Sequence, residues 1–137
     1  MRLLNDAVRQ ALAVGRSATG YERTIDITTT GARSGRARRI ETWFYCIDGR
    51  YYLTGLPGRR GWYANLRAEP AFTFHLKHGV TADLPARATP VDDVPERRRI
   101  FAEVLASQPD NHAGIADPAE IERWVAGSPL VEVSFAT

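Results

Sequence analysis

Hydrophobic and polar residues alternate along much of this chain with the two-residue period that is typical of half-buried β-strands. Alternation, or a run of β-branched and aromatic residues, predicts strands at residues 25–27, 40–47 and 72–76. The same patterns predict three further strands, at residues 51–53, 80–89 and 131–135. Because Pro85 has no backbone N–H, we expect the strand that contains it to be an edge strand or a bulged one.

Short turns and short helices separate these strands. Asp48 and Gly49 tolerate positive φ angles and predict a tight hairpin between the second and third strands. Residues 17–21 are expected to form a loop. Helical patterns occur at about residues 3–15, at residues 62–68, from Pro95 onward, and after the capping-box sequence that begins at Asp117.

Hairpins rather than helical crossovers join the predicted strands, which favours an antiparallel barrel. The 137 residues, of which 44% are hydrophobic, suffice for one compact domain with a substantial core. We therefore predict a single domain over residues 1–137, mainly β with short helices (an α+β protein), with an N-terminal helix at about residues 3–15.

Composition narrows the setting of the protein. No run approaches the roughly 20 apolar residues that a membrane-spanning helix needs, and the first residues lack the apolar stretch of a signal peptide. A cytoplasmic protein is the expectation, and peripheral contact with a membrane stays open. The single cysteine, Cys46, excludes an internal disulfide and any cysteine-only metal site.

Charge is distributed unevenly along the chain. The net charge is only +2, but residues 33–67 carry eight arginines against Glu41 and Asp48, a local balance of +6. Residues 92–137 instead hold nine acidic residues against four arginines, a balance of −5. Such clustering concentrates positive potential where an anion can bind.

The arginines are densest in a turn bracketed by Gly31 and Gly35. No lysine follows Gly35 and a strand rather than a helix comes next, so the turn matches neither common phosphate-loop motif. It does provide backbone amides and the side chains of Arg33, Ser34, Arg36 and Arg38, and a guanidinium can bind two phosphate oxygens at once. A turn whose arginines only face water is the competing interpretation.

Two motifs resemble a known family, the deazaflavin-dependent nitroreductases. Their pattern is roughly T-T-G-R-x-S/T-G-x-x-R followed by W-x-x-N-L-x-A-x-P. In this chain the corresponding segments are residues 28–39 and residues 62–70, with Asp48-Gly49 and an aromatic strand between them. The resemblance implies a split β-barrel related to flavin-binding barrels, with the deazaflavin coenzyme F420 as the hydride carrier.

The resemblance also implies site residues. By position, Arg33 and Ser34 match the groups that contact the phosphate of the cofactor, and Arg38 matches their basic partner. The other positions that the resemblance or the charge pattern places near the cofactor are Arg36, Trp43, Gly55, Leu56, Arg59, Arg60 and Trp62.

The chain departs from the family pattern at several positions. Ala32 replaces the usual arginine, and residues 108–115 lack the tyrosines that line the substrate pocket of nitroimidazole-reducing members. The proton donor is therefore unassigned. Tyr45, Tyr63 and His112 are the candidates, although an aromatic residue in a strand or helix is more often structural.

The leading hypothesis is an oxidoreductase that delivers hydride from reduced F420 to an activated alkene, quinone, enone or nitro compound. A flavin mononucleotide (FMN) enzyme of the same fold is the first alternative, and a non-catalytic barrel that binds a cofactor, lipid or haem is the second. Single-stranded nucleic-acid binding ranks last, because the C-terminal third is acidic. We expect a small-molecule substrate, no nucleic acid, no metal, and either a monomer or a homodimer.

Overall fold

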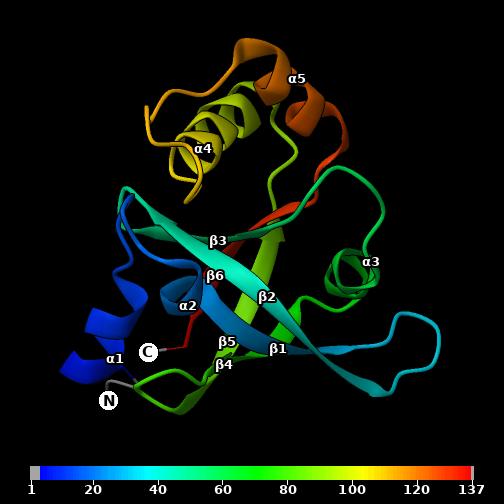
Figure 1. The fold of residues 1–137 in the computed structure, drawn as a ribbon. Helices are drawn as coiled ribbons and strands as arrows, with labels where there is room; N and C mark the ends of the chain where they lie inside the picture. Colours follow the sequence, from blue (N-terminus) through cyan, green and yellow to red (C-terminus); the bar gives the residue numbers. More distant parts are fainter. Residues whose placement is uncertain (1–3, 137) are drawn as a thin grey trace.

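Six antiparallel strands form a closed barrel in the computed structural model, which describes residues 4–136 (Figure 1). The order around the barrel is β1-β2-β3-β6-β5-β4. The strands are β1 (Thr24–Thr30), β2 (Ala37–Ile47), β3 (Arg50–Thr54), β4 (Ala71–Leu76), β5 (Ala82–Pro90) and β6 (Leu130–Phe135). The predicted six-stranded antiparallel barrel is confirmed.

Within residues 4–136, five short helices surround the barrel. They are α1 (Asp6–Leu12), α2 (Gly20–Arg23), α3 (Gly61–Ala68), α4 (Val94–Ala106) and α5 (Pro118–Gly127). Helices α4 and α5 pack together over one end of the barrel, whereas α3 lies beside the β1–β2 turn (Figure 1). Within residues 4–136, every helix is too short or too polar to cross a bilayer.

The N-terminal region differs from the prediction. Helix α1 begins after Asn5, whose side chain caps the Val8 N–H at 2.9 Å, and it ends at Leu12 rather than near residue 15. The segment expected to be a loop contains α2 instead. Thr19 and Glu22 form a capping box there, with the Glu22 N–H donating to Thr19 Oγ1 at 3.1 Å. This T-x-x-E signature is present in the sequence, but no apolar run follows it.

Alternation along the strands divides the buried side chains into two clusters. One fills the barrel and includes Ile25, Ile27, Phe44, Leu53, Phe74, Leu84, Val131 and Val133. The other lies between the outer face of the barrel and the α4–α5 pair, and includes Tyr45, Tyr52, Ile100, Phe101, Val104, Trp124 and Leu130. Because successive side chains of a strand point to opposite faces, Phe44 enters the first cluster and Tyr45 the second.

Strand β2 changes partners along its length. It pairs with β1 from Ala37 to Trp43 and with β3 from Phe44 to Ile47. The predicted hairpin that joins β2 to β3 is confirmed, with φ of 53° at Asp48 and 74° at Gly49. Between residues 37 and 43, the edge of β2 that faces away from β1 has no strand partner in the described part of the chain. This unpaired stretch of β2 lies beside α3.

The expectation that Pro85 marks an edge strand or a bulged one is wrong, because the register runs through Pro85 without interruption. Strand β5 pairs with β4 on one side and with β6 on the other. The carbonyl of Pro85 accepts a hydrogen bond from the Ala136 N–H at 3.2 Å, just beyond the β5–β6 register that starts at Ala86. The nitrogen of Pro85 therefore faces a position past the end of β6, where its missing N–H costs no ladder hydrogen bond.

Candidate functional site

The turn between β1 and β2 depends on its two glycines. The Gly31 N–H donates to the Arg36 carbonyl at 2.8 Å, and the Gly35 N–H donates to the Gly31 carbonyl at 2.9 Å. Gly35 has a φ of 69°, which side chains disfavour. A Cβ atom on Gly31 would lie 2.5 Å from Ser34 Oγ. The Ser34 side chain therefore lies against Gly31 at the start of the turn. A side chain at position 31 would collide with it.

Asn65 holds this turn against α3. Its Oδ1 atom accepts the Ala32 N–H at 2.9 Å, and its Nδ2 atom donates to Thr29 Oγ1 at 3.0 Å. Thr29 is buried, so the second bond is shielded from water. Asn65 follows Trp62 by three residues, which places both side chains on one side of the helix. The W-x-x-N motif contains this clamp, but the sequence alone assigned Asn65 no role.

A cavity of about 440 Å³ lies between the turn, the open edge of β2 and α3. Its lining residues are Thr29, Gly31, Ala32, Arg33, Ser34, Arg38, Ile40, Gly61, Trp62, Ala64 and Asn65. Four of the predicted cofactor-binding residues are among them, namely Arg33, Ser34, Arg38 and Trp62. A second hollow on the other side of the turn shares residues 31–34 with it.

The positive groups of this cavity lack internal partners. Arg33 and Arg38 are exposed, and within residues 4–136 neither guanidinium forms an ion pair or a hydrogen bond. The same part of the chain provides no acceptor for the backbone N–H of Arg33 or Ser34. No aspartate or glutamate is among the residues that line the cavity. The site therefore offers several donors and positive charge to an anion.

The start of α3 strengthens this potential. Arg60 is the N-cap residue and provides no side-chain cap, so among the described residues nothing accepts the N–H groups of Gly61 and Trp62. Both residues line the cavity. Unpaired N–H groups and the positive end of the helix dipole together favour an anion at such a position.

The remaining wall of the cavity is apolar. Ala32, Ala64 and the partly exposed Ile40 line it together with the indole of Trp62, which packs edge-to-face against Tyr63 at 6.0 Å between ring centroids. A cavity that combines an anion-binding end with an apolar, partly aromatic wall suits a flat heterocycle that carries a phosphate. The donor set present therefore fits a flavin-like or deazaflavin cofactor.

The other predicted cofactor-binding residues lie outside this cavity. Arg36 is exposed on the turn, and Trp43 packs on Gly20 near the opposite end of β1. Gly55, Leu56, Arg59 and Arg60 form the loop between β3 and α3. Within this loop, Arg60 donates to the carbonyls of Leu56 and Arg59, each at 2.9 Å. The loop is also tied to α5, because the Gly58 N–H donates to the Gly127 carbonyl at 3.0 Å.

The three candidate proton donors lie in three different places. Tyr45 is buried beneath α4, where it accepts a hydrogen bond from Gln108 at 2.9 Å and where burial raises its pKa. Tyr63 lies on α3 and accepts a hydrogen bond from Arg67 at 2.8 Å. His112 is exposed between α4 and α5. None of them lines the 440 Å³ cavity.

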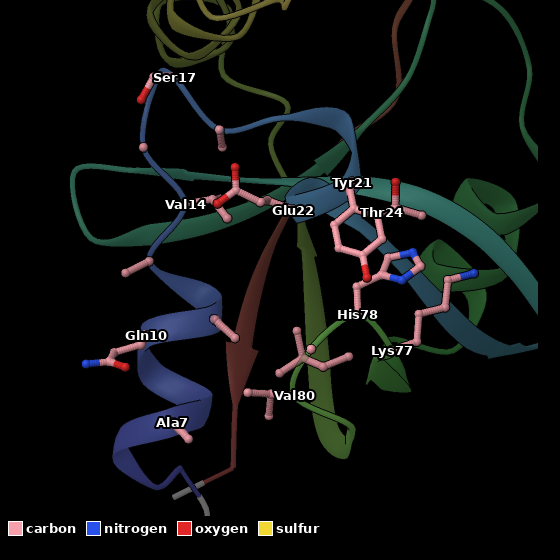
Figure 2. Close-up of a pocket in the computed structure, with 16 residues that line it drawn as sticks. Ala7, Gln10, Val14, Ser17, Tyr21, Glu22, Thr24, Lys77, His78 and Val80 are labelled. Atoms are coloured by element: carbon pink, nitrogen blue, oxygen red, sulfur yellow. The ribbon is translucent and has the colours of Figure 1, made fainter.

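A cavity of similar size, about 430 Å³, lies at the other end of β1, between α1 and the β4–β5 turn (Figure 2). Tyr21 stacks on His78 there, with 4.1 Å between ring centroids. Its one lysine, Lys77, is paired with Asp26 and Glu41. Because this cation is neutralised by protein carboxylates, the cavity lacks the anion-binding character of the site beside α3.

Comparison with protein families gives a match over most of the chain. Residues 1–118 match the family model described as F420H(2)-dependent quinone reductase. A search of curated proteins returned no match.

Solved structures share the fold at low sequence identity. The conserved hypothetical protein Rv2991 from Mycobacterium tuberculosis has a TM-score of 0.68 and 19% identity, over 98% of this chain and 82% of that one. A putative pyridoxamine 5'-phosphate oxidase from Listeria innocua has a TM-score of 0.63 and 10% identity, over 96% and 93%. A third structure, the F420-H2 dependent reductase FDR-A, has a TM-score of 0.54 and 18% identity, over 82% and 94%. These likenesses confirm the predicted split β-barrel.

Proposed function

The chain belongs to the F420H(2)-dependent quinone reductase family, and on this premise we propose that the cavity between the β1–β2 turn and α3 binds the cofactor through its phosphate. As a member of this family, the protein is an oxidoreductase that transfers hydride from reduced F420 to quinones and similar acceptors. One observation carries the assignment of the site. Arg33 and Arg38 line a cavity without carboxylates and have no internal partners within residues 4–136.

In this proposal Arg33 and Arg38 provide the charge that neutralises the phosphate. The N–H groups of Arg33 and Ser34 on the turn and of Gly61 and Trp62 on α3 provide fixed donors. Asn65 fixes the position of the turn relative to α3, because its side chain forms hydrogen bonds with the turn and with the buried Thr29. The donors are arranged before the anion arrives, so little conformational entropy is lost on binding.

The apolar wall orients the flat part of the ligand. The side chains of Trp62, Ile40 and Ala64 would contact the deazaflavin ring. This ring supplies the hydride when the cofactor is bound. The acceptor would approach from the open side of the cavity. We propose a planar, largely apolar acceptor, since it must lie against a flat ring that an apolar wall holds.

Reduction of a quinone to a neutral hydroquinone takes one hydride and one proton. No carboxyl, imidazole, thiol or phenol is among the residues that line the 440 Å³ cavity. We therefore propose that solvent supplies the proton. The candidates Tyr45, Tyr63 and His112 then have no direct part in proton transfer.

Titration with oxidised F420, followed by tryptophan fluorescence, tests the site. Arg33→Gln and Arg38→Gln should each raise the Kd about tenfold, since each removes a charge-assisted bond to phosphate. Arg36→Gln is the matched control, because Arg36 lies on the same turn but does not line the cavity. Equal loss in all three variants would mean that only the overall charge of the turn matters, and the assignment would be rejected.

Turnover of menadione with reduced F420 tests the acceptor class, and competition by FMN tests cofactor selectivity. FMN is the alternative cofactor and requires similar phosphate contacts. Displacement of F420 by FMN at equal concentration would contradict selectivity for the deazaflavin. A cytoplasmic location stays a prediction. The protein is also predicted to be either a monomer or a homodimer, and sedimentation equilibrium would distinguish these two states.

A further inference from the structure

A second positive group lies buried at the opposite end of β1. Arg23, the last residue of α2, is only 2% exposed, and its guanidinium stacks 4.6 Å from the centre of the Tyr45 ring. Its Nη2 atom donates to the carbonyls of Gly15 at 2.8 Å and Arg16 at 3.5 Å. Its Nε atom is buried without a hydrogen-bond partner, and no carboxylate in residues 4–136 forms an ion pair with Arg23.

The other buried arginine shows what a fully bonded guanidinium looks like in this protein. Arg97 is 8% exposed, and its three side-chain nitrogens donate to backbone carbonyls. The acceptors are the carbonyls of Val91, Trp124, Val125 and Ser128, three of which lie at the C-terminal end of α5. The negative end of the α5 dipole thus faces Arg97. Arg23 has no comparable environment.

A cavity of about 120 Å³ lies beside Arg23, between the segment before α2, strand β2 and helix α4. Two carboxylates border it, and each is bound to another arginine. Glu103 accepts two hydrogen bonds from Arg16, at 3.1 and 2.9 Å. Asp48 accepts one from Arg99 at 2.9 Å. The Arg16–Glu103 pair is close to neutral, whereas Arg99 is shared between Asp48 and Glu96. Neither carboxylate at the cavity forms an ion pair with Arg23.

We propose that this cavity binds a small planar oxyanion with a single negative charge, a carboxylate or nitrate, against the guanidinium of Arg23. A buried charge is costly unless an opposite charge or several hydrogen bonds accompany it. One negative charge balances one guanidinium, whereas a dianion would be repelled by Glu103 and Asp48. A planar oxyanion also matches the geometry of guanidinium donors. The volume equals about four water molecules, which is enough for formate, acetate or nitrate.

The bound anion would connect three parts of the fold. Gly15 and Arg16 precede α2, Tyr45 belongs to β2, and Ser107 follows α4, and all four border the cavity. An anion at Arg23 would therefore join the N-terminal segment to the barrel and to the helical layer. The expected role is structural, and it is independent of the site beside α3.

Thermal unfolding with increasing sodium formate, sodium nitrate or sodium chloride, at constant ionic strength set with sodium fluoride, tests this proposal. Formate or nitrate should raise the Tm of the wild type saturably, by about 4–6 °C at ten times the Kd. Arg23→Met removes the charge but keeps most of the side-chain volume, so its Tm should not respond. A larger response to chloride would contradict the planar oxyanion, and equal responses of wild type and Arg23→Met would overturn the site.

Glu103→Gln provides a variant that acts in the opposite direction and does not depend on the folding of Arg23→Met. It frees Arg16 from its carboxylate and removes a negative charge from the cavity wall. The Kd for formate should fall about three- to fivefold. An unchanged or higher Kd for formate would overturn the proposal. Turnover of menadione should be unaffected in both variants, which separates this site from the proposed cofactor site.

Discussion

The arginines of the α4–α5 pair and those of the β1–β2 turn have different surroundings. In the α4–α5 pair, Arg97 binds backbone carbonyls, and the other three arginines bind carboxylates. These three are Arg98 with Glu122, Arg99 with Glu96 and Asp48, and Arg123 with Glu120. In the β1–β2 turn, Arg33, Arg36 and Arg38 have no such partner within the described residues.

The comparison shows that pairing, not the number of arginines, decides where an anion can bind. The arginines of the α4–α5 pair are bound to carboxylates or backbone carbonyls of the protein, whereas those of the turn are available to a ligand. Arg39 sharpens the distinction within a single strand. It is adjacent to Arg38 in sequence, but it pairs with Asp26 at 3.0 Å on the outer face of the barrel.

The largest effect is expected where an arginine serves the fold. Arg97→Met would remove the donor to the Val91, Val125 and Ser128 carbonyls at the interface between α4 and α5. We expect the free energy of unfolding to fall by about 3–5 kcal/mol, as measured by urea denaturation. Arg98→Met, which breaks only an exposed ion pair with Glu122, is the control and should change stability little. Similar stability of both variants would contradict the comparison.

The next effect separates ligand binding from stability. The double variant Arg33→Gln/Arg38→Gln should weaken F420 binding about 100-fold and leave the urea midpoint nearly unchanged. The double variant Arg98→Gln/Arg123→Gln removes the same charge from the α4–α5 pair and should leave the Kd within about twofold. If the second double variant weakened binding as strongly, long-range potential rather than local contacts would hold the phosphate.

Asn65→Ala tests whether the turn must be held against α3. The change leaves the Ala32 N–H and the buried Thr29 hydroxyl without their partner. We expect a loss of about 1–2 kcal/mol of stability and a rise in the Kd for F420, both measured on the same preparation. Loss of stability with an unchanged Kd would show that the donors are positioned without Asn65.

Asp26→Asn converts Arg39 from a paired to an unpaired arginine. The Lys77 ammonium, together with the Arg39 guanidinium, holds the pKa of Asp26 below its usual range. The stabilisation is therefore fully present at neutral pH and is lost as the pH falls below the ordinary pKa of an aspartate.

At pH 7 the Asp26→Asn variant should be less stable by about 0.5–1 kcal/mol, a small value because the pair lies at the surface. The difference from wild type should shrink progressively below about pH 4. Urea denaturation across this pH range provides the measurement. A difference that grew toward acid pH would contradict the assigned direction. Because Arg39 does not line the cavity, the Kd for F420 should stay the same.

The smallest effects concern the proton. Tyr63→Phe and His112→Gln should change the kcat for menadione by less than about twofold, since neither residue lines the cavity and solvent supplies the proton. Steady-state kinetics at saturating F420 measures this. A loss of 100-fold in either variant would identify it as the proton donor.

The local features of the fold could be predicted from the sequence, because their causes are local. Alternation predicts the strands, Asp48-Gly49 predicts the β2–β3 hairpin, and the composition of residues 62–68 predicts a helix. The pairing of the arginines could not be predicted, because it depends on distant segments. Arg16 and Glu103, for example, are 87 residues apart.

Distant segments also decide which of the predicted site residues lie together. Arg33, Ser34, Arg38 and Trp62 were predicted and line one cavity. Trp43 was expected beside the ring, but it is the last β2 residue to pair with β1 and packs on Gly20. Alternation predicts that neighbouring side chains face opposite ways, but it does not predict where a strand leaves its neighbour.

Arg38 lies on the edge of β2 that has no strand partner within residues 4–136, and its charge there affects self-association. A strand edge without a partner can pair with another copy of the chain, and charged side chains are a common protection against such self-association. Between residues 37 and 43 this edge carries Arg38, Arg39 and Glu41. Neutralising Arg38 would thus lower the charge repulsion that opposes pairing of this edge with another copy of the chain. A residue proposed to bind the cofactor would at the same time help to keep the protein from aggregating.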